Sequence, residues 1–355
     1  MQVRPVVDIM NKFSDYFKPG KELSIDEAMI KFKGRHFIKQ YMPNKPDKWG
    51  IKVYYIADAK TGYLLKGNIY LGKKESTNKD FLLGEQVVLN LAKEYENQYH
   101  HIFFDNFFSS VNLLSILLEK KTYACGTIRA NRKEWPESFK KPKTLKLKQG
   151  EYKQLQSGEI TATLWHDKRD VQIISSNCDA SIIKNVPRTA SKNYNEKINI
   201  PCPLPIIQYN NNMGGVDLLD QKRSYYGIGR SSRKWWKYIF KFVMNVAIIN
   251  SHILYDLSNK PSKPKQNTQL NFRINLIKQL IGDHSSFKRS LTQFKRFSTH
   301  LLHNIRKTKY HRICVFCKKN KVLTYLGYTP VSSFQCQQCG VFLCKNNCFN
   351  SYHKD

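Results

Sequence analysis

The sequence predicts an α/β protein with a mixed sheet, crossover helices and a small cysteine-rich module near its C-terminus. Residues 50–130 alternate strand-like and helix-like patterns in the order β-β-α-β-α-β, which is typical of such a sheet. Six of the nine cysteines fall within residues 314–348, which sets that segment apart. The chain carries 59 Lys and Arg against 27 Asp and Glu, and the net charge of +32 favours a polyanionic partner such as nucleic acid.

The composition argues against several classes of protein. Hydrophobic residues make up 41% and aromatic residues 13% of the chain, which supports a packed core rather than disorder. No run of 18 apolar residues predicts a membrane-spanning helix, and the first 20 residues lack a signal-peptide pattern, so no membrane partner and no secretion are expected. The three cysteines outside the module are scattered, which favours a reducing compartment over a disulfide framework.

Local patterns predict the elements of the α/β domain. IKVYYIAD (51–58) is a β-branched and aromatic run that predicts a strand, and residues 63–73 predict its hairpin partner. Residues 84–97 place apolar side chains at helical spacing. HIFFD predicts a short buried strand that ends at Asp105, with a helix and a further strand, YACGTIRA, behind it. Residues 24–50, by contrast, are predicted to be polar and rich in turns before the first strand begins.

The second half of the chain changes character several times. Residues 131–200 are rich in lysine and contain short strand-like pieces, which predicts a β-rich insertion. Residues 201–210 are predicted to be a connector, and residues 235–257 a long helix with apolar periodicity. A Pro/Lys linker over 258–269 is then followed by a basic helical tract.

The C-terminal module has the spacing of a zinc-binding domain. Two CxxC pairs about 20 residues apart are typical of tetrahedral structural zinc. With further ligands the module can hold one or two ions, arranged in an interleaved cross-brace like that of RING domains, although spacing alone leaves the pairing open. The candidate zinc ligands are His311, Cys314, Cys317, Cys336, Cys339, Cys344, Cys348 and His353.

Carboxylates at strand and helix ends suggest a second kind of metal site. Asp58 and Asp105 each end a predicted strand, and Asp217 follows a Gly-Gly turn at a predicted helix start, with Asp220 three residues on. A strand-end pair plus a helix-borne third carboxylate suits two-metal phosphoryl transfer, and oxygen ligands suit Mg²⁺. Each acid alone is also explained as a turn residue or as a helix-start acid near the positive end of the dipole. The residues by themselves do not decide between these interpretations.

A family resemblance favours the metal site. The motifs FKGR, QYMPNKPDKWGIK, DNFFSS and GGVDLLD, followed by the cysteine-rich module, resemble those of the piggyBac transposases in kind and in order over about residues 20–355. The resemblance implies an RNase H-like fold with an insertion domain and an Asp triad. By motif position the triad maps to Asp58, Asp105 and Asp217, with two catalytic Mg²⁺ ions, and Asp220 matches a further acid near the metals.

The same resemblance implies an activity. In that family, water attacks phosphodiesters at the transposon ends, the freed 3′-hydroxyl forms a hairpin with the opposite strand, and insertion occurs at TTAA. The expected partners are double-stranded transposon ends and target DNA and a second copy in a homodimer, and the expected compartment is the nucleus. Only 57 residues precede Asp58, so we expect a truncated copy or a piece of a longer product. A domesticated, catalytically idle, sequence-specific DNA-binding protein is therefore the alternative, and a chromatin-interaction module a third.

Several cations and one tryptophan are candidate DNA contacts. Basic side chains position the phosphate backbone without reading bases, and Trp235 matches the tryptophan of the family motif, where it can stack on an unpaired base. Core packing for the tryptophan and solvent exposure for the lysines are the alternative explanations. The candidate DNA-binding residues are Lys45, Lys48, Arg230, Arg233, Lys234, Trp235 and Lys237.

These expectations divide the chain into six parts. They are a truncated N-terminal segment (1–50), the first part of the RNase H-like domain (51–130), the β-rich insertion domain (131–200), the second part with the third acid (201–257), a basic helical linker region (258–308) and the zinc-binding domain (309–355).

Overall fold

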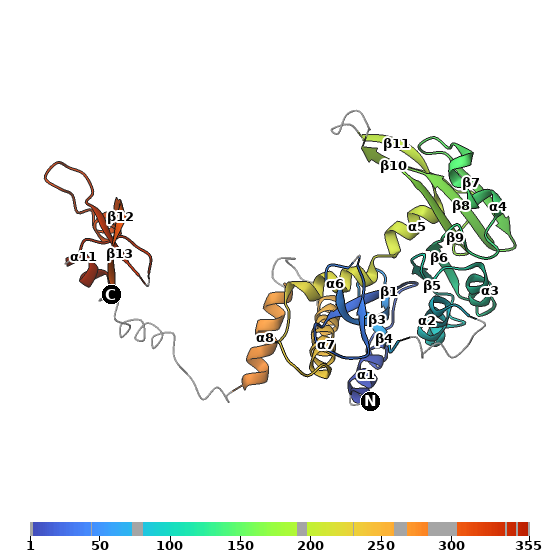
Figure 1. Cartoon of the computed structure of the whole chain (residues 1–355), viewed down its shortest axis with the longest axis horizontal. Helices are drawn as coiled ribbons and strands as arrows, with labels where there is room; N and C mark the ends of the chain where they lie inside the picture. The colour runs from blue at the N-terminus through green and yellow to red at the C-terminus, as the bar shows by residue number, and fades with distance from the viewer. Residues whose placement is uncertain are drawn as a thin grey trace. The chain divides into compact units, whose positions relative to one another are not determined.

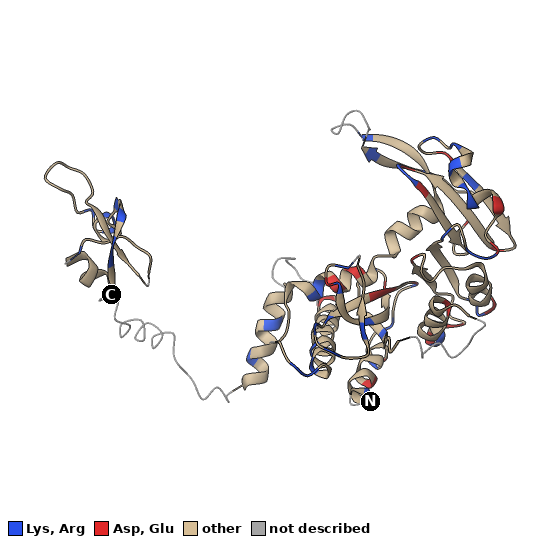
Figure 2. Ribbon diagram, in the orientation of Figure 1, with Lys and Arg blue, Asp and Glu red and all other residues tan. Residues whose placement is uncertain are grey.

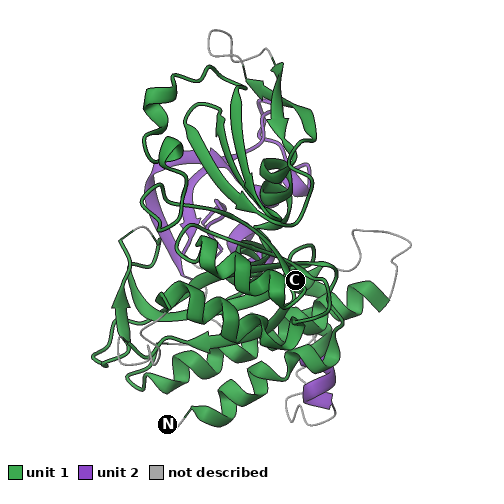
Figure 3. Cartoon of the chain, turned by 90° about the vertical axis from the view of Figure 1, so that its right-hand side faces the viewer, with its two compact units in different colours: residues 1–276 green, residues 277–355 purple. Residues whose placement is uncertain are grey.

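The computed structural model divides into two compact units, residues 1–276 and residues 277–355 (Figure 3). It describes residues 3–43, 45–72, 81–189, 197–229, 231–258, 268–282, 304–337, 339–345 and 347–353. Each unit is considered by itself below.

The first half of unit 1 confirms the predicted order of elements and adds two helices and two strands before it. The predicted β-β-α-β-α-β segment corresponds to β3 (Trp49–Asp58), β4 (Leu64–Ile69), α2 (Leu83–Ala92), β5 (His101–Phe104), α3 (Val111–Glu119) and β6 (Tyr123–Thr127), with the short helix η3 (Lys93–Tyr95) after α2. Ahead of them lie α1 (Arg4–Asn11), the 3-10 helix η1 (Phe13–Tyr16), β1 (Glu22–Lys31) and β2 (Lys39–Tyr41).

Strand β1 corrects the expectation that residues 24–50 are polar and turn-rich. It is ten residues long and lies inside the sheet, antiparallel to β3 and parallel to β5 (Figure 1). The strand is covered on both faces, so apolar residues do not alternate with polar ones along it. Two adjacent acids, Asp26 and Glu27, stand at its centre and give the stretch a polar appearance.

The main sheet has nine strands in the order β2-β3-β1-β5-β6-β9-β8-β7, with β4 paired to β3. Its core, β4-β3-β1-β5-β6, has three antiparallel strands followed by two parallel ones, the RNase H-like arrangement that the resemblance implies. The predicted insertion is β-rich, and three of its strands extend this sheet because β9 pairs with β6. These are β7 (Tyr152–Ser157), β8 (Ile160–His166) and β9 (Asp170–Ser175), preceded by α4 (Glu137–Lys140) and η4 (Pro142–Leu145).

The remaining elements of unit 1 return the chain to the core sheet. A separate two-stranded ribbon of β10 (Ile183–Thr189) and β11 (Lys197–Pro203) precedes α5 (Leu204–Asn212). The predicted connector at 201–210 is therefore wrong, because Pro203 and Pro205 stand where a helix can begin rather than where it is broken. The chain continues into α6 (Gly215–Tyr225), α7 (Trp236–Ser258) and α8 (Gln269–Ile281).

Helix α7 is the long apolar helix predicted at 235–257. It packs with α6 beside β1 (Figure 1) and buries nine side chains, among them Asn245, Asn250 and His252. By length and composition alone, α7 is long and apolar enough to cross a membrane. The search of the sequence for an unbroken run of 18 apolar residues did not find it. Half of its apolar stretch is buried, as in a core helix.

Unit 2 is built around cysteines. It contains β12 (Ile305–Ile313), α10 (Val315–Lys319), β13 (Val331–Cys336) and α11 (Asn347–Tyr352), with β12 and β13 paired antiparallel. Its small core consists of Cys314, Cys317 and Leu343 with a few half-buried neighbours. Of the predicted basic helical linker region over 258–308, the structure describes residues 258, 268–282 and 304–308, and the remainder lies outside the described residues.

Candidate active site and cysteine centres

Asp26 and Asp105 stand side by side at the centre of the main sheet. Strands β1 and β5 run parallel, with Ser24 opposite Phe103 and Ile25 opposite Phe104, so the next position along each strand is an aspartate. Asp26 is 7% exposed, and Asp105 follows β5 directly. Residues in register on parallel neighbours project from the same face, and the charge of Asp105 contributes to the raised pKa of Asp26.

Asp58 lies elsewhere. It pairs with Leu23 near the start of β1, three residues before Asp26, or about 10 Å along the strand. Its carboxylate is used by the adjoining turn: Oδ1 accepts a hydrogen bond from the Gly20 amide at 2.9 Å, and Oδ2 accepts from the Thr61 amide at 2.9 Å and the Thr61 hydroxyl at 2.7 Å. The structure thus does not bring Asp58 to Asp105, and the acid that it does bring there is one that the sequence analysis missed.

The surroundings of Asp26 disfavour the charged form of its carboxyl group. Burial, followed by the neighbouring Glu27 carboxylate, raises the pKa of Asp26 to about 7, although the Glu27 amide and Lys45 oppose the shift. The Asp26 Oδ1 accepts a hydrogen bond from the Glu27 amide at 2.7 Å. A buried carboxylate beside other carboxylates is costly to ionise unless a cation joins them.

Helix α6 brings the third carboxylate toward this face of the sheet. The Gly214–Gly215 turn permits a close approach of α6 to β1, because a Cβ on Gly215 would lie 2.4 Å from the Ser24 Oγ. Ser24 precedes Asp26 by two residues on β1. Asp217 is exposed in the first turn of α6, where the helix dipole favours a negative charge. Figure 2 shows acidic and basic residues together around this helix.

Asp220 faces inward from the next turn of α6. Its Oδ1 accepts hydrogen bonds from the Arg223 Nε at 3.2 Å and Nη2 at 3.1 Å. Burial nevertheless raises the pKa of Asp220, and Asp217 adds to the shift, whereas Arg223 and Lys45 lower it. Asp217 and Asp220 are therefore electrostatic neighbours, as Asp26 and Asp105 are, and Lys45 acts on one acid of each pair.

The predicted cations fall into two groups. Lys45 reaches the acids: its Nζ donates to the Glu27 carbonyl at 3.0 Å and lies 3.8 Å from the Glu27 Oε1. Lys48, Arg233 and Lys234 are exposed, and Lys237 is half-buried with its Nζ 5.7 Å from the Trp236 ring centroid. Arg230 lies outside the described residues.

Trp235 is half-buried and already stacked. Its ring lies 4.2 Å from the His36 ring at an interplanar angle of 29°. This contact joins the FKGR motif region to the N-terminal end of α7. A base that stacks on the same face of Trp235 has to replace His36.

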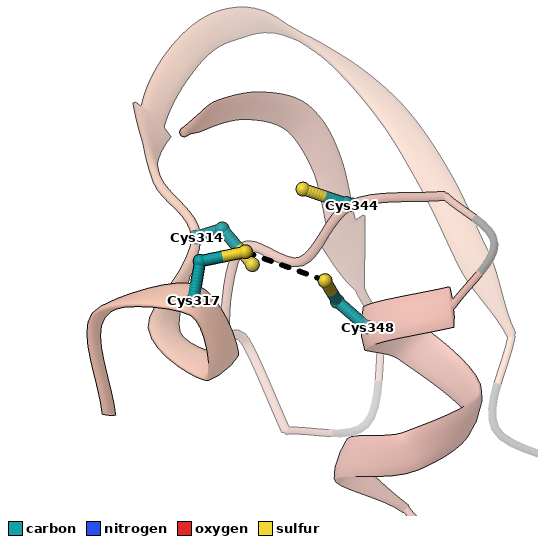
Figure 4. A group of neighbouring side chains, drawn as sticks. All are labelled: Cys314, Cys317, Cys344 and Cys348. Carbon is teal, nitrogen blue, oxygen red and sulfur yellow. Dashed lines mark hydrogen bonds between the residues drawn. The ribbon is translucent and has the colours of Figure 1, made fainter. Parts of the chain in front are cut away.

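The first cysteine group joins residues from both ends of the module. Cys314 and Cys317 lie around α10, and Cys344 and Cys348 come from the chain entering α11 (Figure 4). The four Sγ atoms lie within 4.8 Å of one another, and the Cys317 and Cys348 Sγ atoms are 3.4 Å apart. Four thiols at this spacing match a closed tetrahedral Cys₄ site.

The second group contains Cys336, Cys339 and His353. The His353 Nε2 lies 3.5 Å from the Cys339 Sγ, and its Nδ1 donates to the Phe349 carbonyl at 2.8 Å, which leaves Nε2 as the ligand nitrogen. Because chain order alternates between the two groups, the grouping is the interleaved cross-brace. His311, predicted as an eighth ligand, is exposed on β12 and belongs to neither group.

The comparisons with known proteins agree with this architecture. A family model described as Transposase IS4 matches residues 1–252, so the chain belongs to that transposase family. A solved piggyBac transposase synaptic complex with hairpin DNA superposes with a TM-score of 0.67, at 26% identity over 96% of this chain and 71% of that one. The family and the fold are those of the piggyBac transposases, as the motifs indicate.

Two human proteins are among the curated relatives. The piggyBac transposable element-derived protein 3 is 26% identical over 100% of this chain and 59% of its own length. The piggyBac transposable element-derived protein 2 is 29% identical over 72% of this chain and 44% of its own length. The chain thus spans about half the length of the curated relatives it matches.

Proposed function

We propose that this protein is a piggyBac-type transposase that cleaves and rejoins DNA strands at a centre formed by Asp26, Asp105 and Asp217. The observation that carries the proposal is the register that makes Asp26 and Asp105 neighbours on adjacent parallel strands. Asp58, which motif position alone suggests as the first acid, is assigned instead to the turn that its carboxylate closes. Asp220 supports the centre from the second turn of α6.

The donor set fits Mg²⁺. The acids offer only carboxylate oxygens, the hard ligands that Mg²⁺ prefers. Asp26 is buried with two acids for neighbours, and burial together with the charges of Glu27 and Asp105 raises its pKa to about 7. Bound there, two Mg²⁺ ions would supply activation of the attacking oxygen and stabilisation of the leaving oxygen in phosphoryl transfer.

The chain's own residues then have separate tasks. The sheet positions Asp26 on β1 and Asp105 directly after β5. Asp217 is carried by α6, which the Gly-Gly turn allows to lie close to β1. Arg223 keeps Asp220 oriented through two hydrogen bonds. Lys45 compensates part of the negative charge and lies where it can contact a phosphate of the DNA.

DNA is the partner that the charge and the relatives support. The net charge of +32 favours a polyanion, and the related transposase structure holds hairpin DNA in a synaptic complex. We propose transposon ends and a TTAA target as substrates, a hairpin intermediate, a homodimer as the working assembly and the nucleus as the site of action. Lys48, Arg233, Lys234 and Lys237 are proposed phosphate contacts, and Trp235 a stacking residue that exchanges His36 for a base.

The two cysteine groups are proposed to hold structural zinc. The first is closed by four thiols, and the second offers two thiols and an oriented imidazole among the described residues. Such a module has too small an apolar core to be stable without its ions.

The proposal is tested by incubating the full chain with a labelled duplex that carries the inverted repeat flanking its gene, in Mg²⁺ and in EDTA. Mg²⁺-dependent nicking followed by hairpin formation is the expected result. We also expect DNA retention to weaken steeply between about 50 and 200 mM salt, because contacts to several phosphates release counterions. Retention without any nicking would instead support the domesticated DNA-binding alternative.

A further inference from the structure

Unit 2 carries an exposed apolar loop that neither the acid centre nor the cysteine groups use. We call it the α10–β13 loop, because it joins these two elements, and every residue from Lys318 to Tyr328 is exposed. Tyr325 is 95% exposed and Leu326 is 63% exposed. Single exposed apolar residues are ordinary on protein surfaces, whereas a group of them is typical of an interaction site. The exposed apolar residues of the loop are Val322, Leu323, Tyr325, Leu326 and Tyr328.

The tip of the α10–β13 loop has a defined shape. The Thr324 amide donates to the Tyr328 carbonyl at 2.8 Å, and the Gly327 amide donates to the Thr324 carbonyl at 2.9 Å. Gly327 has a φ of +80°, a conformation that favours glycine. The resulting turn places Tyr325 and Leu326 at its two central positions. Because the chain's own groups close this turn, a partner that binds the two side chains does not have to order the loop first.

The surroundings of the loop carry positive charge alone. Residues 304–353 contain eight Lys and Arg and no Asp or Glu, and Figure 2 shows basic without acidic residues over this part of the chain. Three of the eight, Lys318, Lys319 and Lys321, directly precede the apolar side chains and are exposed with them. No cation of the module therefore has an acidic partner within the module. The eight are Arg306, Lys307, Lys309, Arg312, Lys318, Lys319, Lys321 and Lys345.

The charge and the apolar surface together define the chemistry of a partner. The lysines match acidic groups, and the loop matches apolar side chains. A DNA backbone suits the lysines, but it offers no aliphatic surface to Val322 or Leu323. A second copy of the module brings eight further cations, and a basic peptide is repelled in the same way. An acidic segment of another protein that also carries large apolar side chains matches both features.

We propose that the α10–β13 loop docks a segment of another protein in which acidic residues accompany large apolar ones. The acidic groups lie against the three lysines, and the apolar side chains pack on Tyr325 and Leu326 at the tip. This role goes beyond the proposed function, because it brings a partner protein to the chain and uses none of the acids of unit 1. The zinc module is then a recruitment surface as well as a structural domain.

The test selects peptides on the full chain in the presence of Zn²⁺. The probe is a random peptide library displayed on phage, selected on wild type and, separately, on Tyr325→Ser/Leu326→Ser. We expect the wild-type pool to enrich peptides that combine Asp or Glu with Leu, Phe or Trp. Fluorescence polarisation with the most enriched peptide should show binding by the double variant that is at least about tenfold weaker, because two apolar contacts are lost.

Two changes to the enriched peptide separate the charges from the apolar contacts. Asn and Gln in place of its acids, or Ser in place of its apolar residues, should each weaken binding to wild type. Raised salt should weaken binding of the original peptide only in part, since the apolar contacts are not screened. A wild-type pool enriched in acids alone would overturn the inference, because general attraction to the cations would then explain binding.

The matched control lies in the same module. Tyr310→Ser removes a likewise exposed tyrosine from β12 and should leave peptide binding unchanged. Both variants should keep the zinc content of wild type, since the changed side chains lie outside the cysteine groups. Peptide binding by Tyr325→Ser/Leu326→Ser equal to that of wild type would overturn the inference and leave the cleavage proposal intact. Loss of DNA retention by this variant with peptide binding unchanged would assign the loop to DNA and overturn it as well.

Discussion

Asn250 on α7 takes the place of a neighbouring strand for Leu64 on β4. Its Oδ1 accepts a hydrogen bond from the Leu64 amide at 3.0 Å, and its Nδ2 donates to the Leu64 carbonyl at 2.9 Å. Asn250 is 3% exposed, so these backbone groups have no water to replace the amide. These two hydrogen bonds attach α7 to β4 at the edge of the sheet. Helix α6, which carries Asp217 and Asp220, packs against α7.

Loss of this contact should destabilise unit 1. Asn250→Ala leaves a buried amide and carbonyl without partners, and we expect the free energy of unfolding to fall by about 2–4 kcal/mol. Chemical denaturation followed by tryptophan fluorescence measures the change. Asn90→Ala, at an exposed position on α2, is the matched control and should shift stability by less than about 0.5 kcal/mol. Equal effects of the two variants would show that the Asn250 contact contributes nothing.

The buried charge of Asp26 should make Mg²⁺ a stabilising ligand. The folded pKa of about 7 lies above the unfolded value of 3.8, so the metal-free fold loses stability as pH rises between these values. At pH 8, Asp26→Asn should therefore raise the melting temperature of the metal-free protein. Added Mg²⁺ should stabilise wild type but give this variant little further gain. A melting temperature of wild type that is independent of Mg²⁺ would count against a metal site at these acids.

Helix α8 should help to position Asp220. The Arg273 side chain donates to the Asn245 Oδ1 at 2.5 Å, and the Asn245 Nδ2 donates to the Arg223 carbonyl at 3.3 Å, where α6 approaches its end. Arg273→Met removes the first contact, so we expect faster amide exchange in α8 and at the end of α6. Because Arg223 orients Asp220, the rate of cleavage should fall severalfold while DNA retention is unchanged. The nearby Lys278→Met, on the same helix, should leave exchange in α6 as in wild type.

The two histidines of unit 2 should differ in their effect on zinc. His353→Ala removes a ligand from the second group, and we expect the bound zinc to fall by about one ion per chain with partial unfolding of the module. His311→Ala should keep the full zinc content because His311 lies outside both groups. Zinc measured by mass spectrometry of the native protein decides the point. Loss of zinc in His311→Ala but not in His353→Ala would reverse the assignment.

The sequence predicts elements better than it predicts which of them meet. Strands β3 and β5 and helix α7 follow from β-branched runs and helical periodicity, which are local properties of the chain. Strand β1 is not predicted by the same patterns, because it is buried on both faces and carries Asp26 and Glu27 at its centre. A signal was present, since apolar residues flank the two acids from Leu23 to Ile30, but acidic pairs are more common in turns than in central strands.

The acid centre depends on a pairing that no local pattern contains. Asp58 and Asp105 both end strands, yet β3 runs antiparallel to β1 and β5 runs parallel to it, so Asp58 lies level with the start of β5 and Asp105 lies at its end. Strand direction and register are set by long-range contacts rather than by spacing. The cysteines are the contrasting case. CxxC spacing predicts their role, whereas the grouping of the ligands and the place of His311 outside both groups required the structure.

The account is tested most directly by comparing Asp26→Asn with Asp58→Asn in the Mg²⁺-dependent cleavage of the transposon-end duplex. We expect Asp26→Asn to lower the cleavage rate by at least about a thousandfold with DNA retention preserved, because the variant loses a carboxylate at the centre of the site. Asp58→Asn should remain active within about tenfold and lose mainly thermal stability, because its carboxylate only holds the turn at Gly20 and Thr61. Full activity of Asp26→Asn together with a dead but folded Asp58→Asn would contradict the assignment of the first acid.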